Sequence, residues 1–337
     1  MVTIKDIARE SGYSISTVSR VLNHRNDVSP EAKKRIEEVV EQYHFVPNNN
    51  AKHLKQNNTK AIGILVKGIS NMLFSSIVEE IQQMIEKTDY TLMVSYIDEE
   101  ENEVDHAVQL CVERKPLGLL FLGGNPAYFK EGFVKVDVPC VLVSNRAHEI
   151  CFDNLSSVAT DDVAAAKRAV DALFEAGHTE IGILGGNVEN SHTSRQRFQG
   201  CIESFKEHNK ELDLELCYEK ARFSFDSAYR AMQRLVEKYP NITSVFAMSD
   251  VMAIGAIRAL RDMNYRVPQD ISVIGFDGTE LAEYYNPKLA SIKQQYKTLA
   301  TRSVEILFGQ IELKKEPIHE IVPFEFVSGE SIQNMKK

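Results

Sequence analysis

The chain has 337 residues, of which 43% are hydrophobic and 26% charged, and its net charge is −9. These values are typical of a globular protein of two or three domains, and they exclude a chain coated in basic surface. Residues 1–60 carry 10 Lys or Arg against 7 Asp or Glu, so a mildly basic head precedes an acidic body, which favours contact with a polyanion at one end only.

The five cysteines are scattered and form no CxxC pair, which favours reduced thiols in the cytosol. The nine histidines show no metal-ligand spacing. We therefore expect neither a metal nor a cofactor. The first ten residues are polar and lack the apolar core of a signal peptide, and no apolar run approaches the roughly 20 residues of a membrane helix.

Residues 3–23 predict two short helices joined by a tight turn. Thr3 and Asp6 are spaced as a capping box, Gly12 suits the turn, and Ser14 is a candidate N-cap of the second helix. In that second helix Val18, Val21 and Leu22 are expected to point inward, whereas Ile15, Ser16, Thr17 and Arg20 point outward. This outline is typical of a helix-turn-helix, whose second helix lies in the DNA major groove. A small helical hairpin without a DNA role is the alternative.

Ser29, Pro30 and Glu31 predict the start of a third helix, which closes the small core of the head. An Asn-rich stretch follows from residue 48. It reads either as a polar linker or as one or two helical turns around Leu54 that form only against DNA or a second copy of the chain.

From Ala61 onward, apolar strands alternate with amphipathic helices. This alternation predicts parallel sheets covered on both faces, and similar runs at 61–66 and 180–185 suggest two lobes facing each other across a cleft at the carboxyl ends of the strands. The predicted strands are 61–66, 92–96, 118–122, 140–143, 181–184, 245–248 and 273–276, and the predicted helices are 74–87, 103–113, 162–176, 197–208, 227–238 and 251–263.

The motifs KDIARESGYSISTVSRVLN, VPNNNAKHLK, FAMSDVMAIGAIRAL, ISVIGFDGTELA and ASIKQQY resemble the lactose/galactose repressor family over residues 2–330. The resemblance implies an α/β fold, with a small all-α helix-turn-helix head and two Rossmann-like parallel-sheet lobes of periplasmic-binding-protein type. The implied domains are a head at 1–45, a hinge helix or linker at 46–59, a head-side lobe at 60–159 and 290–319, and a distal lobe at 160–289 and 320–332.

The resemblance also implies a bacterial cytoplasmic, nucleoid-associated repressor that binds double-stranded, palindromic operator DNA as a homodimer. Ile15, Ser16 and Arg20 match base-reading positions; Ile15 offers apolar contact to a thymine methyl, and Arg20 grips either a guanine edge or a phosphate. Leu54, flanked by Lys52 and Lys55, matches a leucine that inserts at the central base step of the operator. The other expected DNA contacts are Thr17, at a phosphate, and Ser14, Asn23, Asn48 and Ala51.

The effector implied by the resemblance is a sugar, glycoside, nucleoside or phosphosugar in the interlobe cleft. Such ligands need aromatic faces and fixed polar groups. Phe74 matches a stacking position, with core packing as the alternative. Arg197 can grip two oxygens, with a surface ion pair as the alternative. Asp277 can accept from two hydroxyls, with a turn or helix cap near Thr279 as the alternative.

The resemblance assigns five further residues to the effector site. Phe223 matches a lid aromatic, with Phe225 as its rival, and Asn145 fits the galactose-repressor branch. Ser249 stands where the lactose repressor has Asn, a departure that would widen the pocket. Gln294 and Tyr296 match the crossover between lobes, where Tyr296 either stacks on the effector or packs at the hinge.

The expected mechanism couples the cleft to the operator. The effector favours one interlobe arrangement, which moves the dimer interface at the helices 74–85 and 296–313 and changes the separation of two recognition helices that must lie about 34–36 Å apart. The short tail after Ile332 leaves no room for tetramerising heptads, so we expect a dimer.

Two other classes of protein share parts of this pattern. An NAD-dependent enzyme would need a GxGxxG after a strand, and neither that motif, a P-loop nor HExxH is present. A periplasmic-type sugar-binding protein without regulation would lack the helix-turn-helix. We therefore expect no enzymatic activity.

Overall fold

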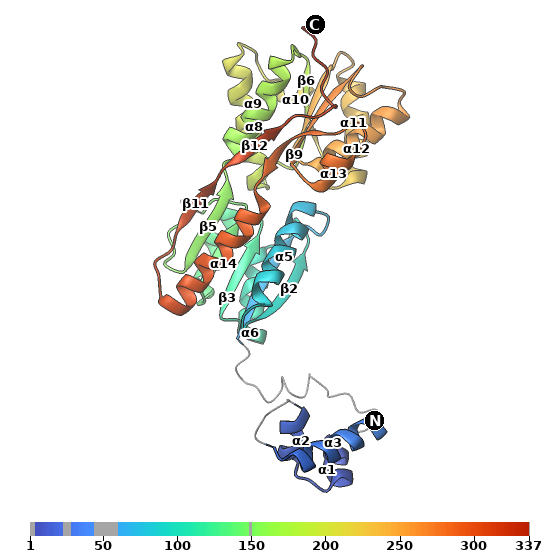
Figure 1. The fold of residues 1–337 in the computed structure, drawn as a ribbon. Coiled ribbons are helices and arrows are strands. Elements are labelled where there is room, and N and C mark those ends of the chain that lie inside the picture. The colour runs from blue at the N-terminus through green and yellow to red at the C-terminus, as the bar shows by residue number, and fades with distance from the viewer. Residues whose placement is uncertain (1–3, 23–27, 44–59, 148–149, 337) are drawn as a thin grey trace. The chain divides into compact units, whose positions relative to one another are not determined.

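The computed structural model describes residues 4–22, 28–43, 60–147 and 150–336. The chain divides into two compact units, Met1–Thr59 and Lys60–Lys337, which are described separately (Figure 1).

The first unit contains three described helices, and its fold follows from a few apolar side chains. Ile7, Val18, Val21 and Ile36 are buried to 3% exposure or less and form the centre of its core. Gly12 has φ +78, the left-handed conformation that the predicted turn needs. The helices are α1 (Ile4–Ser11), α2 (Ile15–Leu22) and α3 (Pro30–Gln42).

Two capping side chains place the helices of the first unit. Ser14 Oγ accepts a hydrogen bond of 3.1 Å from the Thr17 amide, which confirms the predicted start of α2. Ser29 Oγ accepts from the Ala32 amide at 3.3 Å, with Pro30 at the first helical position, as predicted for α3. The predicted cap at Thr3 lies outside the described residues.

The second unit has two lobes, each built on a six-stranded sheet. The first sheet has the order β11-β5-β4-β3-β1-β2, and all its pairs are parallel. Helices α5 (Met72–Ile85) and α14 (Tyr296–Leu313) cover one face, and α6 (Glu103–Arg114) and α7 (Pro126–Gly132) cover the other. The strands are β1 (Ala61–Lys67), β2 (Thr91–Ile97), β3 (Gly118–Leu122), β4 (Cys140–Val143), β5 (Leu155–Thr160) and β11 (His319–Val322).

The second sheet has the order β12-β10-β9-β8-β6-β7, in which only the described pair β10–β12 is antiparallel. The helix pairs α8/α9 and α11/α12 lie on either side of this sheet (Figure 1). The strands are β6 (Ile181–Gly185), β7 (Tyr218–Lys220), β8 (Ser244–Ala247), β9 (Ser272–Asp277), β10 (Ala290–Gln294) and β12 (Phe324–Val327); the helices are α8 (Asp162–Glu175), α9 (His192–Glu207), α10 (Leu214–Cys217), α11 (Phe225–Lys238), α12 (Asp250–Asp262) and α13 (Glu280–Tyr284).

The chain passes between the lobes after β5, after β10 and between β11 and β12. Two of the predicted lobe boundaries differ from this strand pairing. The range 290–319 was assigned to the first lobe, yet β10 pairs with β9 and β12 in the second sheet. The range 320–332 was assigned to the distal lobe, yet β11 pairs with β5 in the first sheet. Both strands are short and partly polar, so no change of apolar pattern marks the crossovers.

Candidate functional site

The described part of the first unit presents the outer face of α2. Val18 and Val21 are buried against α1 and α3, whereas Ile15 is 43% exposed and Ser16 and Arg20 are exposed. The hydroxyl of Ser14 lies 2.7 Å from that of Ser16 and 2.8 Å from that of Thr17, so one turn carries three polar groups. The inward and outward faces agree with the sequence pattern.

Six of the predicted DNA contacts lie outside the described residues. They are Asn23, Asn48, Ala51, Lys52, Leu54 and Lys55, and their roles stay predictions.

The second unit contains a cavity of about 1050 Å³ between its two lobes. Its walls come from the carboxyl ends of β1, β2, β3, β6 and β9 and from the helix starts that follow them. Four predicted effector residues line it: Phe74, Arg197, Phe223 and Asp277. The cleft predicted from the alternation of strands and helices is therefore present where parallel sheets place ligand sites.

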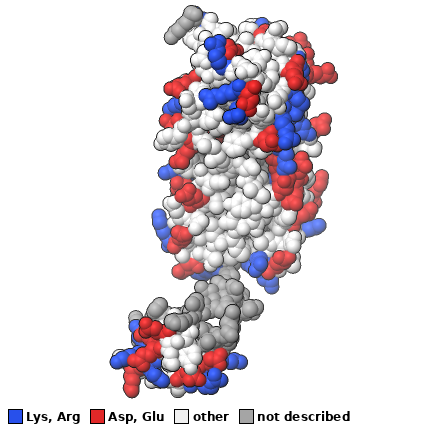
Figure 2. All heavy atoms as spheres, turned by 90° about the vertical axis from the view of Figure 1, so that its right-hand side faces the viewer, with Lys and Arg blue, Asp and Glu red and all other residues white. Residues whose placement is uncertain are grey.

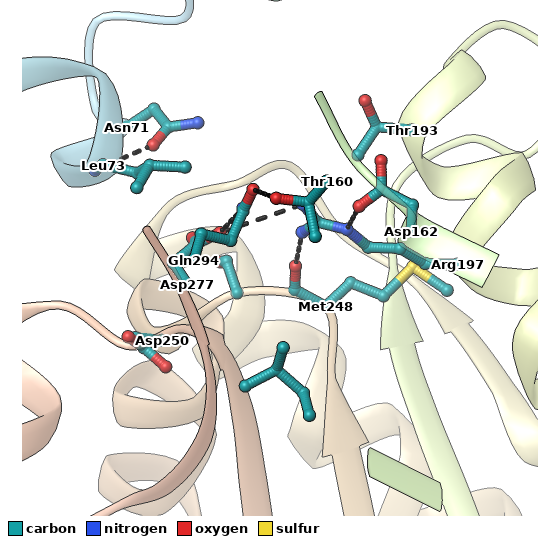
Figure 3. A network of polar contacts seen from close by, with 12 residues as sticks. Asn71, Leu73, Thr160, Asp162, Thr193, Arg197, Met248, Asp250, Asp277 and Gln294 are labelled. Atoms are coloured by element: carbon teal, nitrogen blue, oxygen red, sulfur yellow. Dashed lines mark hydrogen bonds and ion pairs between the residues drawn. The ribbon is translucent and has the colours of Figure 1, made fainter. Parts of the chain in front are cut away.

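Arg197 occupies the centre of a buried polar network (Figure 3). Its Nε donates to Asp162 Oδ1 at 2.8 Å, its Nη1 donates to the Met248 carbonyl, and its Nη2 lies 3.8 Å from Asp277 Oδ1. The guanidinium also lies 3.7 Å from the ring centroid of Phe276. With 3% of the residue exposed, the alternative of a surface ion pair is wrong. These contacts with protein groups hold the guanidinium in position.

Asp277 ends β9 in an unusual backbone conformation, with φ +114, and is 5% exposed. Burial raises the pKa of Asp277 to about 7, although the positive charge of Arg197 opposes this rise. The predicted alternative, a cap near Thr279, is not what its carboxylate does. Asp250 Oδ2 instead accepts from the Thr279 amide at 2.7 Å and from its hydroxyl at 2.9 Å.

Gln294 joins Asp277 to the other lobe. Its Nε2 donates to Asp277 Oδ1 at 2.9 Å, and its Oε1 accepts from Thr160 Oγ1 at 2.9 Å (Figure 3). Thr160 ends β5 and Gln294 ends β10, so this bond connects two of the three crossovers. Gln294 does not line the cavity itself, but it is hydrogen-bonded to Asp277, which does.

The first-lobe wall contains Phe74, which packs in the core as the alternative predicted and whose stacking on an effector stays a prediction. Asn71 Oδ1 caps α5 by accepting from the amides of Leu73 and Phe74 at 3.1 and 3.4 Å, which fixes the ring at the start of the helix. Phe74 is 6% exposed and belongs to the core under α5, and its edge also lines the cavity.

The second-lobe wall separates the rival aromatics. Phe223 is partly buried and lines the cavity, whereas Phe225 begins α11, is 45% exposed and is not part of the lining. The position of Phe223 favours it as the aromatic that meets a ligand.

The remaining predicted residues surround the site without lining the large cavity. Ser249 Oγ caps α12 by accepting from the Met252 amide at 3.2 Å. Tyr296 begins α14 and lines a separate cavity of about 480 Å³. Asn145 Nδ2 donates to the Gly124 carbonyl at 3.0 Å and to Thr193 Oγ1 at 3.2 Å. Within the described residues no donor reaches its buried Oδ1.

Several residues of the site were missed by the sequence reasoning. Arg222 Nη2, from the second lobe, lies 2.7 Å from Asp98 Oδ2, and its Nε donates to Glu99 Oε1 at 2.5 Å across the mouth of the cavity. The hydrogen bond from Arg222 lowers the pKa of Asp98. Lys67 pairs with Glu103 in the first-lobe wall at 2.5 Å. The acidic run at 98–101, directly after β2, is a sequence signal that could have indicated this edge of the cavity.

Among the described residues, no helix is long and apolar enough to span a bilayer. No group of three or more His, Cys, Asp or Glu side chains in the same ranges is arranged to hold a metal ion.

Residues 3–48 match the family model of bacterial regulatory proteins of the lacI family, and residues 170–332 match the periplasmic binding protein-like domain. The chain is 37% identical over 337 residues to the HTH-type transcriptional regulator MalR of Clostridium butyricum, covering 99% of this chain and 100% of that relative. It is 30% identical to the ribose operon repressor of Haemophilus influenzae, covering 96% of each. A Lac repressor structure bound to ONPG has the same fold, with a TM-score of 0.76 at 24% identity over 98% of this chain and 99% of that one.

Proposed function

Because this chain belongs to the lacI family of bacterial regulatory proteins, we propose that it represses transcription as a homodimer on a palindromic operator and that a sugar in the interlobe cavity controls its grip on DNA. It is a transcriptional regulator and not an enzyme. One observation carries the proposal: the chain joins a helix-turn-helix unit to a two-lobed unit whose cavity lies at the strand ends.

In this proposal the outer face of α2 reads the operator. Ile15 meets a thymine methyl, Ser16 and Arg20 meet base edges, and Thr17 meets a phosphate, because Ile15, Ser16 and Arg20 are exposed and Thr17 is half-buried, whereas Val18 is buried. Ser14, Asn23, Asn48 and Ala51 are the flanking contacts, while Leu54 with Lys52 and Lys55 acts in the minor groove.

The sugar is held between the lobes. Arg197 and Asp277 supply fixed polar groups in the cavity, and Phe74 and Phe223 supply apolar faces, one from each lobe. Asn145 stays a proposed effector position one residue after Ser144, which lines the cavity. Ser249, Gln294 and Tyr296 support this site from outside its lining.

The dimer proposal draws on the outer surface of the second unit. Figure 2 shows a broad area without Lys, Arg, Asp or Glu, between charged margins, on the side where β2 and α13 lie in Figure 1. Val94 and Tyr96 on the edge strand β2 are 37% and 50% exposed, and Tyr284 on α13 is 84% exposed. An apolar edge strand without a partner is a natural surface for a second protomer. Helices α5 and α14 remain the interface elements expected from the sequence.

The proposed control links the sugar to this interface. A ligand that touches both lobes stabilises one interlobe arrangement by its differential affinity, which is typically about 1–3 kcal/mol of coupling. The bond between Thr160 and Gln294 places the site next to two crossovers, so the lobes turn about the same residues that hold Asp277. The protein works in the bacterial cytoplasm, where we propose that it associates with the nucleoid.

The test begins with DNA. The full-length protein is used to select fragments from a bacterial genomic library, and fluorescence anisotropy then measures binding to the selected site with and without a panel of sugars and nucleosides. Release by a sugar would identify an inducer, and tighter binding would identify a corepressor. Arg20→Ala should weaken binding to the selected site by about 1–3 kcal/mol, whereas Arg35→Ala on the exposed face of α3 serves as the matched control. Selection of no fragment above random DNA would contradict the proposal.

A further inference from the structure

The cations in the wall of the large cavity are already neutralised. Lys67 pairs with Glu103, Arg197 with Asp162, Arg222 with Asp98 and Glu99, and Arg234 with Glu219. Among the described residues, Lys220 is the one lining Lys or Arg without an ion pair, and it stands exposed at the rim. A charged ligand therefore meets cations that are already paired inside the cavity, and an unpaired lysine, Lys220, only at its rim.

The pair of Lys67 and Glu103 is the most enclosed of these in the first lobe. The side chain of Glu103 is 1% exposed and that of Lys67 is 12% exposed, and their charged atoms lie 2.5 Å apart. The second carboxylate oxygen of Glu103 accepts from the Asn125 amide at 2.5 Å, and the Lys67 ammonium lies 5.0 Å from the centroid of the Tyr128 ring. A phosphate at Lys67 would approach this buried carboxylate, which is held by the Lys67 ammonium and the Asn125 amide. Its repulsion would oppose whatever attraction the ammonium offers.

The helix starts around the cavity are also occupied. Helix N-termini bind anions through their free amides. Here Asn71 Oδ1 accepts two amides of α5, Asn125 Oδ1 accepts the Ala127 amide of α7 at 3.1 Å, and Ser191 Oγ accepts the Ser194 amide of α9 at 3.2 Å. At α7, Pro126 has no amide hydrogen and the Tyr128 amide donates to the Asn125 carbonyl. The amides of Leu73, Phe74, Ala127, Tyr128 and Ser194 at these helix starts therefore already have acceptors and are not free to bind a phosphate.

The lining also carries more carboxylates than its cations need near the mouth, since Arg222 pairs with both Asp98 and Glu99 and the neighbouring Glu100 borders the cavity as well. We propose that the effector is an uncharged carbohydrate and that Glu103, by neutralising Lys67, excludes phosphorylated sugars from the site. This inference rests on the proposed control by a sugar and narrows it to one chemical class. Glu103 acts here as a specificity residue that works through Lys67.

The experiment compares matched pairs of probes on the full-length protein by isothermal titration calorimetry: glucose and glucose 6-phosphate, ribose and ribose 5-phosphate, trehalose and trehalose 6-phosphate. In any pair of which one member binds, the neutral sugar is expected to bind at least about tenfold more tightly. Equal or tighter binding of the phosphorylated member would overturn the inference while leaving sugar control intact. Binding of a nucleoside by a protein that binds none of these sugars would overturn both this inference and the proposed control by a sugar.

A second variant tests the role of Glu103 directly. Glu103→Gln keeps the acceptor for the Asn125 amide and removes the charge that neutralises Lys67. The preference for the neutral member should fall by about tenfold, because a free ammonium then faces the ligand. Glu113→Gln, at the far end of the same helix and exposed, removes one charge away from the cavity and should leave the ratio unchanged. An unchanged ratio in a folded Glu103→Gln protein would overturn the assignment. If the Glu103→Gln variant does not fold, the comparison of neutral and phosphorylated sugars on the wild-type protein still tests the inference.

Discussion

Replacing Arg197 by Met should destabilise the second unit far more than the loss of a surface charge would. The substitution keeps an unbranched side chain but leaves Asp162 and Asp277, 7% and 5% exposed, without their shared counter-charge. Removing one partner of a buried ion pair typically costs about 3–5 kcal/mol, against 1 kcal/mol or less for an exposed pair. Loss of the contact with the Phe276 ring acts in the same direction. The free energy of unfolding should therefore fall by about 3–5 kcal/mol.

The loss should also depend on pH. The positive charge of Arg197 opposes the rise in the pKa of both carboxyls that burial causes. Without it these pKa values rise further, so relief of the buried charge by protonation costs less at pH 6 than at pH 8. The destabilisation should be larger at pH 8 than at pH 6.

Urea unfolding of the full-length protein, followed by circular dichroism at the two pH values, measures both effects. The matched control is Arg258→Met, which breaks an exposed pair with Asp262 on α12 and should cost less than about 1 kcal/mol. Adding Asp162→Asn to Arg197→Met should recover part of the loss, because one uncompensated charge is removed. A loss as small as that of the control, or equal at both pH values, would refute the buried-charge reasoning. It would also mean that effector response can be tested at Arg197 without concern for folding.

Three further predictions concern other parts of the second unit. Because burial raises the pKa of Asp277 to about 7, above its value in the unfolded chain, the folded state keeps this proton to higher pH; stability should fall as pH rises through 7, and thermal unfolding of Asp277→Asn should show a smaller pH dependence. Arg222→Met should weaken effector binding in calorimetry by no more than about fivefold, since its cross-lobe pairs are half exposed, and a loss beyond a hundredfold would place Arg222 on the ligand itself. Gly200→Ala should lower the free energy of unfolding by about 1–3 kcal/mol in urea titrations, because its Cβ would collide with the Val163 carbonyl of α8, and no loss would mean that the two helices separate easily.

The sequence allowed seven strands of the two sheets to be predicted because each is a nearly continuous apolar run. Six of them are buried on both faces, whereas the edge strand β2 is partly exposed. Strand β5 was missed because its centre reads Leu-Ser-Ser-Val, and Ser156 and Ser157 look like loop residues. Both are buried, at 0% and 3%, and satisfied by neighbours that are distant in sequence: Ser156 Oγ accepts from the Ile318 amide at 3.0 Å, and Ser157 Oγ from the Ala147 amide at 3.1 Å. Such hydrogen bonds leave no local signal.

The residues of the candidate site likewise fall into those that sequence motifs located and those whose contacts no sequence pattern indicated. Positions matched by family resemblance placed Phe74, Arg197, Phe223 and Asp277 around the cavity, since a motif preserves where the chain turns at a strand end. The same matching could not tell that the hydroxyl of Ser249 caps α12. The contact between Arg222 and Asp98 spans 124 residues and exists only because two lobes meet, so no periodicity or spacing encodes it.

Leu73 and Asp277 border both the cavity of about 1050 Å³ and the neighbouring one of about 480 Å³. These two side chains are thus a thin partition between two chambers. The other walls of the smaller chamber come from α5, the segment from Gly278 through α13, the strands β10 and β12, and Tyr296 at the start of α14. A ligand that displaces the partition from one side changes the shape of the chamber on the other, next to the helices where a second protomer would rest. A ligand bound in the larger cavity therefore affects the smaller cavity, which it does not occupy.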